Sequence, residues 1–171
     1  MTAYAGLLRA VNVGGTGKLA MSDLRRICED CGLTRVATHI QSGNVVFQSR
    51  RAEAGVKQLL EQALAKHLGK PCEVLIRTAA ELRELLEDPP FADAPPNRVI
   101  VLFLAQAPPA DCLKAVVAPG GEQLALRGRE LFIYYPQGQG ATKLKLPFQK
   151  TGTGRNLNTV RRLLEMLEAL A

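Results

Sequence analysis

Two polar stretches in the N-terminal half carry side chains that could bind a ligand. They run from residue 9 to residue 18 and from residue 41 to residue 44, and their candidate ligand-binding residues are Arg9, Asn12, Gly14, Gly15, Lys18, Gln41, Ser42, Gly43 and Asn44. Arg9 and Lys18 are cations that can pair with a carboxylate or a phosphate. The glycines allow backbone N–H groups to turn toward an anion and form an anion nest. Taken singly, the neutral residues are better explained by turn capping. Taken together, they predict a polar pocket for a small anionic ligand.

A further polar stretch lies near the C-terminus and adds the candidates Lys143, Arg155 and Asn156. Residues 151–160 would present amides, hydroxyls and a guanidinium ahead of the last helix, where the helix dipole favours an anion. Capping by Asn156 or Asn158 explains the asparagines and threonines but not Arg155. We therefore predict that loop 151–156 folds toward the first two stretches, so that Arg9 and Arg155 hold one anion.

No motif in the sequence predicts a reaction or a cofactor. The run Gly14–Lys18 fails as a phosphate loop, because Asn12 replaces the first glycine and Leu19 replaces the serine or threonine. It also lacks the third glycine of the dinucleotide fingerprint. Neither His39 nor His67 accompanies a recognisable nucleophile motif. A small enzyme acting on a phosphorylated or carboxylated metabolite, with Arg9 and Lys143 as electrophilic holders, remains the alternative to a binding protein.

The four cysteines are predicted to be reduced structural residues without a metal. Cys28 and Cys31 have the spacing of a redox or zinc pair, but they close a helix, where the helix dipole disfavours a thiolate. A second pair of this spacing is missing. Cys72 and Cys112 show no framework spacing.

Hydrophobic periodicity predicts which elements position the two N-terminal stretches. Strands are expected at 3–11, 35–40, 45–48 and 72–77, and helices at 21–31, with Ser22 as its N-cap, and 56–67. This β-α-β-β-α-β order is the split βαβ, ferredoxin-like unit. In that unit the first strand ends at the sheet edge that carries the hairpin between strands two and three. Residues 12–18, residues 41–44 and the turn at 69–71 should therefore be neighbours.

The second half is predicted to echo the first incompletely. Thr78 and Glu81 form a capping box for a helix that ends at Leu86, and residues 89–97 read as a Pro-rich linker. A strand is expected at 98–105, a short helix at 110–117, a hairpin turning at Gly128, and a final helix at 158–171. The expected fold is α+β, with ferredoxin-like half-domains at 1–88 and 98–171 that carry antiparallel sheets with helices on one face.

The charge and composition of the chain limit the kinds of partner that it is expected to bind. Residues 141–171 carry six basic and two acidic side chains, so they hold +4 of the net charge of +6. A basic face suggests an anionic partner, although a solvated helix face explains it equally well. A nucleic-acid-binding module is weakly supported, because the chain has no tryptophan and no aromatic cluster for stacking bases. With no apolar run for a membrane span and no signal segment, we expect a soluble cytoplasmic protein of undetermined oligomeric state.

Three sequence blocks together resemble a known bacterial family, domain of unknown function 1697. They are Leu8–Gly15, Thr38–Phe47 and Thr153–Val160. The resemblance implies two ferredoxin-like half-domains and no established activity, and it marks the candidates above other than Lys18 as motif positions. The chain departs from the family at Leu157, where tryptophan is usual, and is shorter between Lys143 and Arg155. If that tryptophan stacks on a ligand, this chain would bind the ligand weakly or differently. If the tryptophan only packs in the core, leucine replaces it with modest loss.

Overall fold

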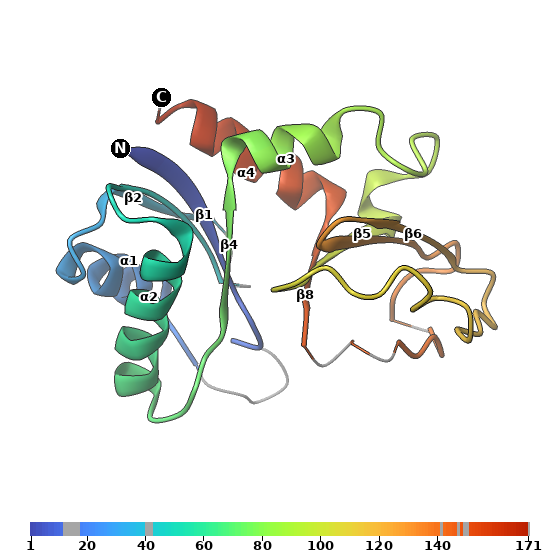
Figure 1. Cartoon of the computed structure of the whole chain (residues 1–171), viewed down its shortest axis with the longest axis horizontal. Coiled ribbons are helices and arrows are strands. Elements are labelled where there is room, and N and C mark those ends of the chain that lie inside the picture. The colour runs from blue at the N-terminus through green and yellow to red at the C-terminus, as the bar shows by residue number, and fades with distance from the viewer. Residues whose placement is uncertain (12–17, 40–42, 141, 147, 149–150, 171) are drawn as a thin grey trace. The chain divides into compact units, whose positions relative to one another are not determined.

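The structure is a computed structural model that describes residues 1–11, 18–39, 43–140, 142–146, 148 and 151–170. The chain forms two compact units (Figure 1). The first unit holds residues 1–84 together with 162–170, and the second holds residues 85–161. Two helices therefore cross the boundary along the chain, α3 (Ala79–Leu86) and α4 (Leu157–Glu168).

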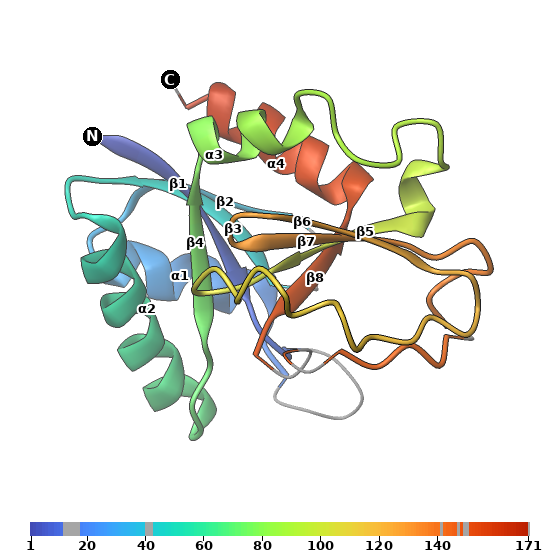
Figure 2. The ribbon, with the colours of Figure 1, turned by 45° about the vertical axis from the view of Figure 1, so that its right-hand side comes forward.

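The first unit is built on a four-stranded antiparallel sheet in the order β2-β3-β1-β4. Its elements are β1 (Thr2–Leu8), α1 (Met21–Asp30), β2 (Thr34–His39), β3 (Asn44–Ser49), α2 (Glu53–Leu68) and β4 (Val74–Thr78). Helices α1 and α2 lie side by side on one face of this sheet (Figure 2). The strand order and the helix placement confirm the predicted ferredoxin-like unit.

Apolar spacing explains why α1 and α2 form and which face they bury. Leu24, Ile27 and Cys28 make the buried stripe of α1, and Val56, Leu60 and Leu64 make that of α2. These residues pack with Tyr4, Leu8, Val45, Phe47, Val74 and Ile76 from the sheet. A glycine in the left-handed conformation follows each helix, Gly32 after α1 with φ +83° and Gly69 after α2 with φ +73°.

The two helix starts that the sequence predicted in detail have different outcomes. Thr78 and Glu81 form the predicted capping box at α3, with Thr78 N–H donating to Glu81 Oε1 at 3.1 Å and Glu81 N–H donating to Thr78 Oγ1 at 3.2 Å. The prediction that Ser22 caps α1 is wrong. The helix begins one residue earlier and Ala20 is its N-cap, without a side-chain hydrogen bond.

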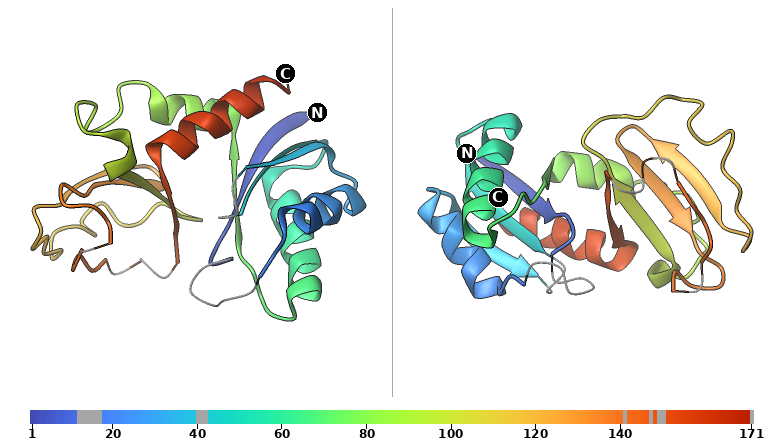
Figure 3. Two further views of the ribbon diagram at one scale, coloured as in Figure 1. Left: turned by 180° about the vertical axis from the view of Figure 1, so that it is seen from behind. Right: turned by 90° about the horizontal axis from the view of Figure 1, so that it is seen from below.

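The second unit contains a four-stranded antiparallel sheet with the equivalent strand order, β6-β7-β5-β8. Its elements are a short 3₁₀ helix (Pro96–Arg98), β5 (Val99–Phe103), β6 (Gln123–Arg127), β7 (Glu130–Tyr134) and β8 (Thr153–Asn156). The predicted hairpin at Gly128 is confirmed, and β8 supplies a fourth strand that the sequence did not reveal (Figure 3). Both halves therefore share one sheet topology.

The helix predicted at 110–117 is wrong. Single turns occupy this stretch, with Cys112 N–H bonded to Pro109 O, Lys114 N–H to Asp111 O and Val116 N–H to Leu113 O. Prolines on both sides and two adjacent valines leave too few residues to nucleate a helix. The apolar residues are used nonetheless, because Leu113, Val116 and Ala118 pack on the apolar cluster formed around Leu102 and Ile133.

Helix α4 ends against the first sheet, although the sequence predicted it as part of the second half-domain. The Leu170 carbonyl accepts hydrogen bonds from Arg35 Nη1 at 3.1 Å and Gln48 Nε2 at 2.8 Å. On α3, Arg83 also pairs with Glu168 at 3.3 Å. The first unit is thus discontinuous in sequence. Among the described residues, no helix has both the length and the hydropathy needed to span a membrane.

Candidate functional site

The end of β1 lies directly beside the hairpin between β2 and β3, as the strand order predicted. Leu7 is paired with Asn44, and Leu8 N–H donates to Gly43 O at 2.9 Å. Among the candidate residues at this edge, Asn12, Gly14, Gly15, Gln41 and Ser42 lie outside the described residues. The described candidates here are Arg9, Lys18, Gly43 and Asn44.

The segment that leads into β4 runs along the other side of residue 9. Arg9 N–H donates to Glu73 O at 2.9 Å, and Cys72 Sγ donates to Arg9 O at 3.9 Å. The predicted proximity of the turn at 69–71 therefore holds. These contacts fix the backbone around Arg9 from both neighbouring strands.

A cavity of about 130 Å³ opens at this place. Its lining comes from the end of β1 and from the segment between α2 and β4, and comprises Arg9, Ala10, Val11, Leu68, Lys70, Pro71, Cys72 and Glu73. Arg9 is half-buried and Lys70 is exposed. Ala10 has φ +56°, a conformation that is unfavourable for a residue with a side chain. Two cations and one carboxylate therefore share the wall of one small cavity.

Gly43 and Asn44 hold the end of β1 against the hairpin. Asn44 is fully buried, and its Nδ2 donates to His39 O at 3.0 Å. A Cβ on Gly43 would lie 2.6 Å from Val11 Cγ2 and 2.8 Å from Leu8 Cβ. The turn-forming explanation of both residues is therefore sufficient, and both position Arg9 indirectly.

The candidates near the C-terminus, Lys143, Arg155 and Asn156, belong to the second unit. They differ in what their side chains do. Lys143 is exposed, whereas Asn156 Oδ1 accepts the Thr159 N–H at 2.9 Å and caps α4. The prediction that Arg155 lies in a loop is wrong, because it lies on β8, paired with Val101 of β5. Its Nη1 donates to Thr153 Oγ1 at 2.6 Å and to Gly154 O at 2.9 Å. Burial lowers the pKa of the Arg155 guanidinium to about 10.

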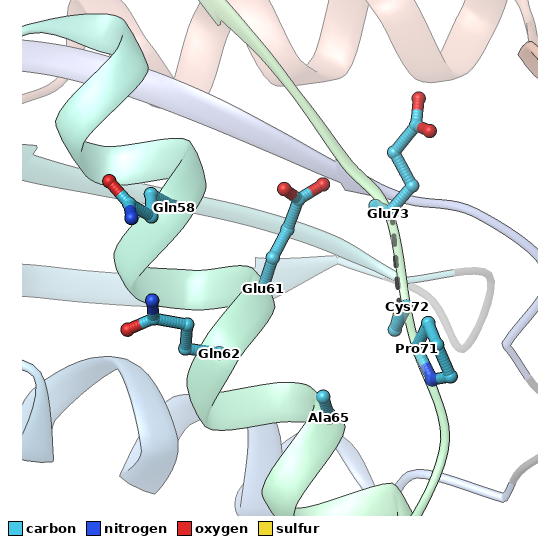
Figure 4. Close-up of a pocket in the computed structure, with 7 residues that line it drawn as sticks. All are labelled: Gln58, Glu61, Gln62, Ala65, Pro71, Cys72 and Glu73. Atoms are coloured by element: carbon cyan, nitrogen blue, oxygen red, sulfur yellow. Dashed lines mark hydrogen bonds between the residues drawn. The ribbon is translucent and has the colours of Figure 1, made fainter.

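A second cavity, of about 380 Å³, lies between α2 and the segment before β4 (Figure 4). Its lining comprises Gln58, Glu61, Gln62, Ala65, Pro71, Cys72 and Glu73. Glu61 reaches from α2 toward β4, where its Oε2 accepts hydrogen bonds at 3.0 Å from Lys57 Nζ and from Val74 N–H. The same lysine donates to Val74 O at 2.7 Å. Lys57 and Glu61 therefore hold the start of β4 next to α2 through hydrogen bonds to Val74.

Sequence reasoning missed Glu61, Lys70 and Glu73 as wall residues. The signal for Lys70 was present, since the turn at 69–71 was predicted to lie at this edge. The signal for the α2 residues was their spacing, because residues 58, 61, 62 and 65 recur on one helical face.

The thiols of Cys28, Cys31 and Cys72 are poor nucleophiles in this fold. Burial, followed by the nearby Cys31 and Glu29, raises the pKa of the Cys28 thiol to about 12. Burial is also the main cause that raises the pKa values of Cys31 and Cys72. Cys28 and Cys72 are buried, whereas Cys31 and Cys112 are half-buried. Within the described part of the chain, no three histidine, cysteine or acidic residues gather as a metal site would require.

The chain resembles a family of known sequences and a solved bacterial structure. A sequence model of the family described as "Protein of unknown function (DUF1697)" matches residues 1–132. The conserved bacterial protein SP0830 from Streptococcus pneumoniae is 27% identical, with a TM-score of 0.80 over 97% of this chain and 98% of that one. No curated protein matches the sequence.

Proposed function

The chain belongs to the DUF1697 family of proteins of unknown function, and from that premise we propose that it binds a small anionic ligand where Arg9 and Lys70 line one cavity. This shared cavity is the single observation that carries the proposal. It lies at the sheet edge where the sequence predicted a polar pocket.

Charge and burial favour an anion over a neutral ligand here. Arg9 is half-buried at the end of a strand whose preceding residues, Leu7 and Leu8, are at most 1% exposed. A guanidinium in such partly dehydrated surroundings binds a carboxylate or phosphate more strongly than one in bulk water. Lys70 adds a second positive charge on the same wall.

Glu73 is the one acidic residue in this wall. In Figure 4 its carboxylate points away from Pro71. The two cations exceed the single carboxylate, so the net charge of the wall is positive. An anionic group of modest size, such as a phosphate, a phosphonate or a carboxylate, suits a cavity of about 130 Å³.

The test is calorimetric titration with inorganic phosphate and propylphosphonate at low ionic strength. Losing one charge-assisted contact should weaken binding by about ten- to a hundredfold in Arg9→Gln and in Lys70→Gln. The matched controls are Arg50→Gln and Lys114→Gln, which remove an equal charge from exposed positions and should leave the affinity unchanged.

Two results would contradict the proposal. One is the absence of measurable heat with either probe. The other is equal loss of affinity in Arg9→Gln and Arg50→Gln, which would mean that the anion responds only to overall charge.

A further inference from the structure

The cavity of about 380 Å³ beside α2 (the α2 cavity) adjoins the proposed anion site. We propose that it holds a hydrocarbon chain of the same ligand, so that the ligand is an amphiphile with an anionic head and a short apolar chain. This inference rests on the proposed function, because the head is the anion that Arg9 and Lys70 would bind.

The α2 cavity has the size and the kind of lining that bind the apolar part of a small molecule. Its volume falls within the range of roughly 300 to 1,000 Å³ that is typical of ligand pockets, which are lined mainly by apolar groups. Ala65 from α2 lines it together with Pro71 and Cys72 from the opposite segment (Figure 4). Burial raises the pKa of the Cys72 thiol, so this side chain stays uncharged at neutral pH.

The polar groups that α2 contributes to the lining are turned away or already used by the protein. In Figure 4 the amide ends of Gln58 and Gln62 point away from the segment before β4, which leaves their methylene stems as the parts nearest the cavity. Glu61 Oε2 accepts hydrogen bonds at 3.0 Å from Lys57 Nζ and from Val74 N–H. A polar ligand group would therefore lose its hydrogen bonds to water here without gaining equivalent ones.

The two cavities share one wall, which places both of them within reach of one ligand. Pro71, Cys72 and Glu73 line both cavities. Cys72 is buried in this wall, and its Sγ donates to Arg9 O at 3.9 Å. The thiol therefore lies next to the backbone that carries Arg9, on the side of the α2 cavity. A ligand whose anion lies beside Arg9 can extend its chain over this wall into the α2 cavity.

Burial of hydrocarbon sets the size of the expected gain in affinity. A methylene group that is fully removed from water strengthens binding by about fourfold. Gln58, Gln62 and Pro71 are exposed, so the rim of the α2 cavity is open to solvent and a chain lying in it stays partly hydrated. We therefore expect about half of the full effect, which is about twofold in affinity for each methylene.

The experiment compares probes that differ only in chain length. Full-length protein is titrated calorimetrically with methyl-, propyl- and pentylphosphonate at low ionic strength. The affinity should rise by about sixteenfold from methyl- to pentylphosphonate, which differ by four methylenes. The heat-capacity change of binding should become more negative along the series, because more apolar surface leaves water.

Two variants and one control locate the chain. Ala65→Gln places a longer, neutral and polar side chain on the cavity side of α2, and should reduce the gain to about twofold while methylphosphonate affinity stays within about twofold. Arg9→Gln should weaken methyl- and pentylphosphonate by the same factor, because head and chain belong to one ligand. Ala54→Gln makes the same change at an exposed residue of α2 outside both linings, and should preserve the gain.

The possible failures are distinguishable. Equal affinity for the three probes, with each weakened by Arg9→Gln, would overturn this inference and leave the anion site standing. A gain that persists in Ala65→Gln, or pentylphosphonate binding that Arg9→Gln leaves unchanged, would place the chain elsewhere and would also overturn the inference. No binding of any probe would overturn both proposals.

Discussion

Gly43 has a left-handed backbone conformation and also leaves no room for a side chain. Substitutions at Gly43 and Gly69 can measure these two effects separately. Its φ is +85°, and the space that a side chain would need is taken by Leu8 and Val11. Gly69 has a similar φ of +73° but open space around its Cα. Comparing alanine variants at Gly43 and Gly69 therefore separates the free-energy cost of the left-handed conformation from the cost of the steric clash with Leu8 and Val11.

We expect Gly43→Ala to lower the free energy of unfolding more than Gly69→Ala does. The left-handed conformation costs alanine about 1 to 2 kcal/mol at either site. At Gly43, overpacking adds about 1 to 3 kcal/mol. Urea denaturation followed by circular dichroism measures both, and equal losses in the two variants would mean that the end of β1 can move away from the hairpin at little cost.

Cys28 links stability to pH through its burial. Its pKa of about 12 in the folded state lies above the ordinary value of 9.0, so only the unfolded chain loses this proton between those limits. The contribution to stability is therefore fully present below pH 9 and is lost as the pH rises toward 12.

Raising the pH from about 8 to about 10.5 should remove about 2 kcal/mol of unfolding free energy through Cys28 alone. Other groups titrate in this range, so the measured quantity is the difference in pH slope between the parent and Cys28→Ala. Leu24→Ala serves as the control, because it opens a cavity in the same core without removing a titratable group. A Cys28→Ala variant with the parent's slope would be inconsistent with this assignment.

At the scale of elements, Asn156 is the residue where capping and ligand binding compete as explanations. Its Oδ1 already accepts the Thr159 N–H at the start of α4. Asn156→Ala should therefore destabilise the protein by about 1 kcal/mol, whereas Asn156→Ser should retain most of the stability. Thermal unfolding checks both variants, and equal melting temperatures for alanine and the parent would count against the cap.

Local signals predicted most elements of the first unit, although not the N-cap of α1, because apolar spacing and turn residues there are properties of short stretches of sequence. The stripe of α1 and the glycine after it, and the capping box of α3, are properties of a few adjacent residues. The edge that joins the end of β1 to the hairpin followed from strand order alone. The ligand itself could not be predicted from the sequence, and the cavity walls needed coordinates.

Elements that depend on distant partners were the ones missed. The sequence Thr153–Asn156 contains a glycine and a polar run typical of a loop, and it becomes β8 only through pairing with β5. Residues 110–117 were predicted to form a helix, but they form consecutive single turns. In this conformation their apolar side chains still pack on the apolar cluster of the second sheet. In both cases tertiary contacts override the local pattern.

At the scale of the whole molecule, the first unit depends on residues from both ends of the chain. Leu163 and Leu167 of α4 are at most 1% exposed, and the Leu170 carbonyl is held by Arg35 and Gln48. A fragment of residues 1–84 should therefore expose apolar surface that the intact protein buries.

We expect fragment 1–84 to bind the dye ANS and to melt without a cooperative transition. Residues 156–171, joined to it through a flexible Gly-Ser linker, should restore cooperative melting. The same fusion carrying Leu163→Asp and Leu167→Asp should fail to do so, since these buried leucines would be replaced by charges. A cooperative transition of equal midpoint in the unfused fragment would contradict the expectation.

The discontinuity of the first unit also has a consequence for synthesis on the ribosome. Residues 162–170 are translated after the whole of the second unit, yet they complete the first. The first unit therefore stays incomplete while residues 85–161 emerge. Chaperones that shield apolar surface on nascent chains should therefore engage this protein late into translation, and a slow codon placed just before residue 162 should prolong that engagement.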